Sequence, residues 1–293
     1  MPYARNGDVE LYYETFGSPS DPALLLVNGL GSQCINFSDA WCEKHVAEGF
    51  FVIRFDNRDV GLSTKFAHVE PDLAAVVKAR AEGREPPVPY NVSDMARDAI
   101  AVLDALGIAR SHVMGFSMGG MIVQTLAIEH PDRLLSMISV MSTTGDRDVG
   151  QSAPEAQELL FAPAPTDRDG YIDRHLQGIR TWGSPAYYDE ERLRPFAGAA
   201  FDRCFDPAGQ ARQVMAIVAG SSRTEALRDV RVPTLVLHGS ADRLVDPSGG
   251  RRTAEAIPGA RFVLIDGMGH DYPPQLWDQI VALVSEHARA AHP

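Results

Sequence analysis

The segment 115–120, Gly-Phe-Ser-Met-Gly-Gly, places a serine between glycines two residues before it and two residues after it. The run Ser111 to Met114 predicts a strand before this segment, and a helical pattern from Met118 to His130 follows it. A serine in such a strand-to-helix turn holds its hydroxyl exposed above a sheet. The glycines let strand and helix approach without Cβ clashes. Ser117 is therefore the candidate nucleophile, and the alternative is an ordinary turn whose serine caps the helix.

A serine hydroxyl attacks a carbonyl only when a base takes its proton and an acid holds that base in the right tautomer. After Ser117, the chain supplies Leu-His-Gly-Ser-Ala-Asp at 237–242 and Ile-Asp-Gly-Met-Gly-His at 265–270, each directly after an apolar run. The carboxyl ends of parallel strands meet at one edge of a sheet. We therefore expect Asp242 as the acid and His270 as the base beside Ser117, in the order serine, acid, histidine.

Two other carboxylates compete with Asp242 for the role of the acid. Asp246 precedes a proline and is typical of a helix cap, and Asp266 lies earlier in its loop and can make a turn bond. The loop geometry after the strand favours Asp242. His238 ends a strand and is expected to be structural, and for His270 the alternative is a surface loop histidine.

Negative charge that develops on a carbonyl oxygen needs backbone donors. The amide of Met118, at a helix N-terminus, is one expected donor. The amide of Leu30, in the Asn-Gly-Leu-Gly loop at 28–31, is the other, although this loop can also be read as a plain turn. Gly29 and Trp182 are the candidate substrate contacts.

The composition limits the classes of partner. The chain has 293 residues, 45% of them hydrophobic, which suits one large α/β domain with an insertion. A net charge of −12 argues against nucleic acid and anionic membranes as partners. A small-molecule ester is the expected partner, and the sequence leaves both a monomer and a homodimer open.

The cysteines, the spacing of other possible metal ligands and the N-terminus bear on metal or cofactor binding and on the cellular compartment. Cys34, Cys42 and Cys204 have no metal-type spacing and cannot all pair, which favours a reducing compartment. No His/Asp/Glu cluster has metal-ligand spacing, and we expect neither metal nor cofactor. The N-terminus lacks an apolar signal core and no run is long enough to cross a bilayer. The sequence therefore predicts a cytoplasmic protein.

Apolar runs and amphipathic segments alternate along the chain, which predicts an α/β fold with a mostly parallel, doubly wound sheet and helices on both faces. Val9 to Phe16 alternates and predicts an antiparallel edge strand. Helices are expected from Asp94 to Leu106, capped by Ser93, and from Leu276 to Ala290. The runs expected to be strands buried on both faces are 24–27, 51–55, 112–114, 137–140, 234–237 and 262–265.

Two segments interrupt this alternation. Residues 65–92 predict a helix, Pro71 to Glu82, and a proline-rich loop. Residues 143–222 carry helical patterns and no buried-strand run, which predicts an inserted helical cap over the carboxyl edge of the sheet. The expected division is a core domain of residues 1–142 and 223–293 and a cap domain of residues 143–222. The aromatic residues of this cap are Phe161, Tyr171, Trp182, Tyr187, Tyr188, Phe196, Phe201 and Phe205.

The segment from Asp56 to Ser63, Asp-Asn-Arg-Asp-Val-Gly-Leu-Ser, follows another strand end. Its polar side chains could bind substrate. A buried network of Asp56 or Arg58 that fixes the loops around the site is the favoured interpretation, because buried polar groups need partners.

Together these motifs resemble the α/β-hydrolase superfamily over essentially the whole chain, and within it the esterase branch that includes aclacinomycin methylesterase. The resemblance implies a metal-free serine carboxylic-ester hydrolase with Ser117, Asp242 and His270 as its triad. Many relatives have His-Gly at the oxyanion loop, whereas this chain has Asn28-Gly29. The backbone donor survives that change, but the side-chain hydrogen bonding of the loop will differ.

The expected activity is hydrolysis of small to medium apolar esters through an acyl-enzyme. Lactonases, thioesterases, cofactor-free haloperoxidases and carbon–carbon bond hydrolases share the triad and stay open. A hydrolase of diketo acids would need cations to bind the carboxylate of its substrate, and Arg180, Arg192 or Arg194 could supply them. The favoured interpretation is that these arginines belong to a solvated surface of the cap. A non-enzymatic small-molecule receptor of the same fold is the alternative from another class.

Overall fold

The computed structural model describes residues 2–291, whose strands form one eight-stranded sheet in the order β1-β2-β4-β3-β5-β6-β7-β8. β1 pairs antiparallel with β2 and β2 with β4, and all the remaining neighbours are parallel. The predicted mostly parallel sheet is therefore confirmed. The strands are β1 (Tyr3–Asn6), β2 (Val9–Phe16), β3 (Ala23–Val27), β4 (Phe51–Phe55), β5 (Ser111–Phe116), β6 (Leu134–Val140), β7 (Thr234–Gly239) and β8 (Arg261–Ile265).

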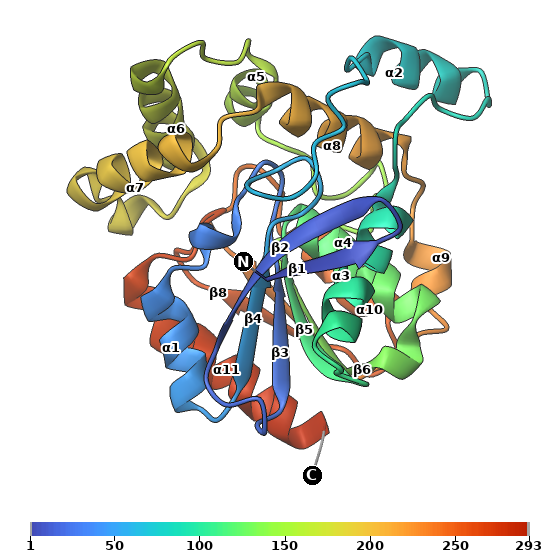
Figure 1. Ribbon diagram of the computed structural model, residues 1–293, viewed down its shortest axis with the longest axis vertical. Coiled ribbons are helices and arrows are strands. Elements are labelled where there is room, and N and C mark those ends of the chain that lie inside the picture. Colours follow the sequence, from blue (N-terminus) through green and yellow to red (C-terminus); the bar gives the residue numbers. More distant parts are fainter. Residues whose placement is uncertain (1, 292–293) are drawn as a thin grey trace.

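Helices cover both faces of this sheet (Figure 1). α3, α4 and α10 bury their apolar residues against one face, and α1 and α11 against the other. Within residues 2–291, no helix is both long and apolar enough to cross a membrane. The helices are α1 (Asp39–Ala47), α2 (Leu73–Ala81), α3 (Val92–Ala105), α4 (Met118–Glu129), α5 (Pro154–Phe161), α6 (Arg168–Trp182), α7 (Glu190–Arg203), α8 (Pro207–Ala219), α9 (Thr224–Leu227), α10 (Ser248–Ala256) and α11 (Trp277–Ala291).

Two of the strand predictions were wrong at the edges of the sheet. β2 is antiparallel as expected, but the short strand β1 covers it and forms the edge itself. At the other edge, β8 is not buried on both faces, and Leu264 is 43% exposed. An edge strand has a neighbour on only one side, so an apolar run there need not be fully buried.

The predicted cap of the third helix was also wrong. The side chain of Asn91, rather than that of Ser93, accepts a hydrogen bond from the amide of Asp94. The Asp94 carboxylate in turn accepts from the amide of Asn91, so the two residues form a reciprocal capping box. Ser93 lies inside the helix, where its hydroxyl donates to Glu129 of α4.

Residues 143–222, all of which the structure describes, form helices α5 to α8 and no strand. In Figure 1 these helices and α2 lie together beyond one end of the sheet. The loop after β6 leaves the sheet at the same end. They contact the loop after β3 directly: the side chain of Gln33 donates to the carbonyl of Ala200 in α7, and the amide of Gly31 donates to Gln213 in α8. The helical segment therefore adjoins the loop that holds the expected oxyanion donor Leu30.

The predicted buried network after β4 is confirmed. The guanidinium of Arg58 donates two hydrogen bonds to the carboxylate of Asp98 in α3, at 2.6 and 2.7 Å, and both side chains are buried. The Asp56 carboxylate accepts from Arg203 of α7 at 2.8 Å. A Cβ on Gly61 would lie 2.1 Å from Asp56 Oδ2, so only glycine fits at that position.

A second buried ion pair ties the same loop to α8. The guanidinium of Arg212 donates to both carboxylate oxygens of Asp59, at 2.8 and 2.9 Å, and the Tyr90 hydroxyl donates to Oδ2 at 2.7 Å. Bidentate arginine–carboxylate pairs fix orientation as well as distance. The loop after β4 therefore holds both α7 and α8 in place over the sheet.

Candidate active site

Ser117 lies directly between β5 and α4 and has backbone angles φ 56° and ψ −117°. A non-glycine residue with positive φ is strained and persists only where its surroundings hold it. A Cβ on Gly115 would lie 2.1 Å from the carbonyl oxygen of Gly119, and one on Gly119 would lie 2.1 Å from that of Val27. The Ser117 side chain makes no capping hydrogen bond, so its hydroxyl does not serve to cap α4.

Asp242 and His270 form a hydrogen-bonded pair. Nδ1 of His270 lies 2.7 Å from Oδ2 of Asp242, and since a carboxylate oxygen accepts, Nδ1 carries the proton. The other oxygen, Oδ1, accepts from the amides of Leu244 and Val245, both at 2.9 Å. The acid is thus held on both of its oxygens.

The two competing carboxylates have other partners. Asp246 accepts a hydrogen bond from the amide of Ser248 at the start of α10. Asp266 accepts from the hydroxyl of Ser240 in the neighbouring loop. The structure therefore pairs His270 with Asp242 and with neither of the alternatives.

His238, expected to be structural, contacts the same oxygen of Asp242 as His270 does. Its Nε2 lies 2.8 Å from the carbonyl oxygen of Val245, so this nitrogen carries the proton, and it also lies 3.3 Å from Asp242 Oδ2. Burial raises the pKa of Asp242, but the charge of His270 and hydrogen bonds from His238 and His270 outweigh burial and lower that pKa to about 2. The acid is therefore ionised at neutral pH.

An aromatic cluster joins the end of β5 to the loop that carries His270. The rings of Phe116 and Tyr272 lie 4.6 Å apart, and Phe37 stacks on Tyr272 at 5.9 Å. The Tyr272 hydroxyl donates to the carbonyl of Asn36 at 2.9 Å. Phe116 immediately precedes Ser117, and Tyr272 follows His270 by two residues, so this packing holds the two loops together.

The glycine-rich loop after β3 lies directly against Ser117. A Cβ on Gly29 would lie 3.2 Å from the Cβ of Ser117. Among residues 2–291, no hydrogen-bond acceptor takes the amide of Leu30 or that of Met118. The Asn28 side chain, at the position where many relatives carry histidine, donates to the carbonyl of Gln33 at 3.1 Å and so closes the loop.

Trp182, at the C-terminal end of α6, contacts the His270 loop through its backbone. Its carbonyl accepts the amide of His270 at 2.6 Å. The indole folds back over its own helix, since a Cβ on Gly178 would lie 2.7 Å from Cζ2 of that ring. The structure thus places Trp182 beside the site, with its carbonyl rather than its ring on His270.

Ser184 and Asp271 add a contact that the sequence analysis missed. Oδ1 of Asp271 accepts from the amide of Ser184 at 2.9 Å and from its hydroxyl at 2.5 Å. The Ser184 Oγ accepts from the amide of Gly269 at 2.9 Å. Burial outweighs these hydrogen bonds and raises the pKa of Asp271. Residues on both sides of His270 are therefore clamped to the segment that follows α6.

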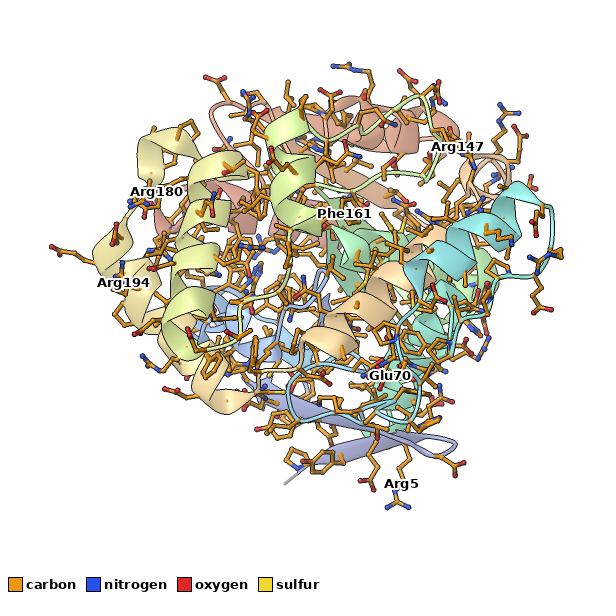
Figure 2. All side chains as sticks on the ribbon, turned by 90° about the horizontal axis from the view of Figure 1, so that it is seen from above. Arg5, Glu70, Arg147, Phe161, Arg180 and Arg194 are labelled. Carbon is orange, nitrogen blue, oxygen red and sulfur yellow. The ribbon has the colours of Figure 1, made fainter. Side chains whose placement is uncertain are left out.

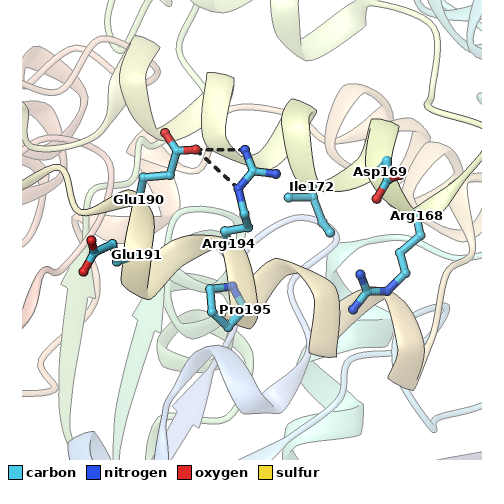
Figure 3. Close-up of a pocket in the computed structure, with 7 residues that line it drawn as sticks. All are labelled: Arg168, Asp169, Ile172, Glu190, Glu191, Arg194 and Pro195. Atoms are coloured by element: carbon cyan, nitrogen blue, oxygen red, sulfur yellow. Dashed lines mark hydrogen bonds and ion pairs between the residues drawn. The ribbon is translucent and has the colours of Figure 1, made fainter.

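The arginines considered as partners for the carboxylate of a diketo acid lie on a surface of charged side chains. Figure 3 shows a pocket of about 660 Å³ between α6 and α7, in which the Arg194 guanidinium points toward the Glu190 carboxylate. Arg180 also donates to Glu190, at 2.5 Å, and Arg192 is exposed. The predicted solvated surface is confirmed for these residues, and the lining of this pocket contains neither Ser117 nor His270.

In the part of the chain that the structure describes, no three His, Cys, Asp or Glu side chains are grouped so as to hold a metal ion. Asp242 and His270 are paired with each other, and Asp242 also accepts from backbone amides. This arrangement suits proton transfer by an imidazole that a carboxylate orients.

Comparison with known proteins identifies the family. The profile of the alpha/beta hydrolase fold matches residues 22–273. The chain is 31% identical over 309 aligned positions to rhodomycin D methylesterase DnrP of Streptomyces peucetius, with 98% of this chain and 97% of that protein covered. It is 28% identical over 254 positions to 3-oxoadipate enol-lactonase 2 of Acinetobacter baylyi, with 85% and 82% covered.

A solved structure supports the same fold. The enol-lactonase from Burkholderia xenovorans LB400 superposes with a TM-score of 0.75 at 24% identity, covering 98% of this chain and 100% of that one. The chain therefore belongs to the alpha/beta hydrolase fold family of enzymes, among relatives that are named esterases and hydrolases. The resemblance to the methylesterase branch is confirmed.

Proposed function

We propose that this protein hydrolyses carboxylic esters through an acyl-enzyme, with Ser117 as nucleophile, His270 as base and Asp242 as the acid that orients it. The observation that carries the proposal is the 2.7 Å hydrogen bond between His270 Nδ1 and Asp242 Oδ2. Because Nδ1 holds the proton, the lone pair of neutral His270 is on Nε2, where it can accept the Ser117 proton.

The reaction proceeds in two matching halves. Oγ of Ser117 attacks the ester carbonyl while its proton passes to His270 Nε2, and the imidazolium is stabilised by the ionised Asp242. The bond to the alcohol oxygen then breaks, and that oxygen takes the proton from His270. Water repeats the attack on the acyl-enzyme, with His270 as base again, which releases the acid and restores Ser117.

The amides of Leu30 and Met118 are the proposed donors to the oxyanion. Each is free of an internal acceptor within the described residues, and the close approach of Gly29 to Ser117 supports their position beside the nucleophile. The Met118 amide also begins α4, whose dipole favours negative charge at that end. Donors aimed at the oxyanion stabilise the transition state more than the substrate.

The proposed substrates are small to medium apolar esters, with residues 143–222 acting as a cap domain on a core of residues 1–142 and 223–293. Gly29 and Trp182 are the proposed contacts with substrate. The hydrogen bond from His270 to the Trp182 carbonyl supports a cap that borders the site. The rings of Tyr171, Phe201 and Phe205 form one cluster on α6, α7 and the turn after them, which supplies apolar surface to that cap.

A lactone is the second candidate substrate, since it is a cyclic ester and takes the same chemistry. The similarity to an enol-lactonase over most of the chain supports it. A diketo acid is less favoured because Arg180 and Arg194 are paired with Glu190. A cytoplasmic location, a monomeric or homodimeric state and independence from cofactors stay predictions.

Replacing Ser117 by alanine tests the proposal. With p-nitrophenyl acetate through octanoate, we expect kcat to fall by about 10³-fold or more, because only the oxyanion donors and binding remain. Ser93→Ala, which removes a partly exposed hydroxyl that donates to Glu129 on α4, is the control and should keep full activity. Ester turnover that persists in folded Ser117→Ala protein would overturn the proposal. Slow single turnover by the unaltered protein would favour the alternative of a non-enzymatic small-molecule receptor.

A further inference from the structure

A second pocket, of about 570 Å³, lies between α2, α8 and the loop that follows β6. Val77, Met121 and Ile217 contribute apolar surface to its wall, and Arg80, Arg147 and Arg223 line it with guanidinium groups. α2 and α8 lie side by side in Figure 2, with Arg147 on that side of the molecule and Arg180 and Arg194 on the opposite side. This pocket is therefore distinct from the one between α6 and α7.

None of the residues that line this pocket carries a carboxylate. Arg80 donates to the backbone carbonyls of Val218 and Gly220 at the end of α8. Arg223 donates to the side chain of Gln124 at 3.0 Å and to the carbonyl of Thr143 at 2.8 Å. All of these acceptors are neutral, so neither Arg80 nor Arg223 is held in an ion pair.

Arg147 is exposed, and its guanidinium makes no hydrogen bond or ion pair with any residue between 2 and 291. The carboxylate of Asp146, next to it in the chain, is already taken by Arg252 and by the hydroxyls of Ser222 and Thr224. Burial lowers the pKa of Arg223 to about 10, which still leaves it charged at neutral pH. Three unpaired cations around one pocket are unexpected in a chain with a net charge of −12.

The pocket in Figure 3 provides a contrast within the same molecule. Its arginines are neutralised, since Arg194 pairs with Glu190 and Arg168 pairs with Asp202 at 2.9 Å. Paired charges of this kind offer little to an added anion. An apolar wall with unpaired guanidinium groups instead matches a ligand with one apolar end and one anionic end.

We propose that the pocket between α2 and α8 binds an organic anion, a carboxylate or phosphate group carried on an apolar chain. Arg80, Arg147 and Arg223 hold the anionic group, and Val77, Met121 and Ile217 pack against the chain. The site adjoins the nucleophile turn, since the amide of Met121 donates to the carbonyl of Ser117. The proposal concerns a site beyond the ester hydrolysis inferred above and does not depend on it.

Isothermal titration of the full-length protein with octanoate, octyl phosphate and 1-octanol tests the proposal without any turnover. We expect both anions to bind and the alcohol, which has the same chain, to bind at least about 10-fold more weakly, as the loss of charged hydrogen bonds requires. Affinity should fall as salt is raised, because the site is open to solvent. The ratio between the two anions shows whether a carboxylate or a phosphate is the preferred group.

Arg147→Gln is the decisive variant, because its side chain supports no other contact and the fold should be unaffected. We expect it to weaken anion binding about 10-fold, and Arg147→Glu to weaken it further, while Arg251→Gln, on α10 outside the pocket, has no effect. Octanoate can also bind as a reaction product beside Ser117, but that binding would be insensitive to Arg147. Equal affinity in all the variants, or equal affinity for 1-octanol, would overturn the proposal.

Discussion

Replacing Ser184 by alanine removes the hydroxyl that joins both sides of the His270 loop to the segment after α6. The Ser184 Oγ donates to Asp271 at 2.5 Å and accepts from Gly269 at 2.9 Å, and the residue is only 1% exposed. The variant leaves the Gly269 amide without this acceptor and Asp271 with one bond fewer. The remaining bond from the Ser184 amide, at 2.9 Å, is retained because it is a backbone contact.

The expected magnitude follows from those two bonds. A hydrogen bond to a charged group contributes about 1.5–3 kcal/mol and a neutral one about 1 kcal/mol. If displacement of His270 adds most of the lost interaction energy to the activation free energy, kcat falls by about 10-fold to 100-fold, since about 1.4 kcal/mol corresponds to tenfold in rate. KM should change little, because Ser184 has no proposed contact with substrate.

The assay is steady-state hydrolysis of p-nitrophenyl acetate and butyrate, with thermal unfolding measured on the same samples. Thr181→Ala is the matched control, because its hydroxyl donates only to the carbonyl of Gln177 on the same helix. Asp271→Asn keeps an acceptor for Ser184, so its kcat should lie between those of Ser184→Ala and the unaltered protein. An unchanged kcat in Ser184→Ala, or a fall matched by Thr181→Ala, would refute the reasoning.

Three further outcomes are expected. Asp242→Asn should lower kcat by about 10³-fold or more, with Asp246→Asn as the near-neutral control, and the reverse order would show that the acid is misassigned. The pKa of Asp242 is lowered to about 2 in the folded protein, so its ionised carboxylate stabilises the fold at neutral pH, and this contribution should be lost as the pH falls below about 4 toward 2; thermal unfolding across that range measures it, and an Asp242→Asn protein with the same acid dependence would contradict it. Arg58→Met should lower the free energy of unfolding by about 3 kcal/mol because Asp98 is left buried and unpaired, which chemical denaturation measures, and a change below about 1 kcal/mol would contradict a structural role.

The parts of the site that local motifs encode could be predicted from the sequence. Ser117 directly follows β5, and Asp242 and His270 lie in the loops after β7 and β8, so the parallel sheet brings these three segments to one edge. The network around Arg58 was predictable for a similar reason, since buried charged groups require partners. The alternation of apolar runs and amphipathic helices was sufficient to predict the mostly parallel sheet as a whole.

Contacts between distant segments could not be predicted in the same way. Ser184 and Asp271 are far apart in the chain, and neither lies in a pattern that indicates the other. Strand β1 is short and mixed in polarity, so its pairing with β2 depends on the hairpin turn at Gly7 rather than on an apolar run. At α3, both Asn91 and Ser93 are good capping residues, and the reciprocal bond with Asp94 decides between them.

Covalent labelling of the serine tests the central claim most directly. An aryl phosphonate that reacts with activated serines should add one phosphonyl group per chain, located by peptide mass spectrometry on the peptide that contains Ser117, with parallel loss of ester turnover. The same reagent should label the His270→Ala protein far more slowly, because the base that activates Ser117 is absent. Loss of activity with the label on a different serine, or full labelling that leaves ester turnover intact, would contradict the account.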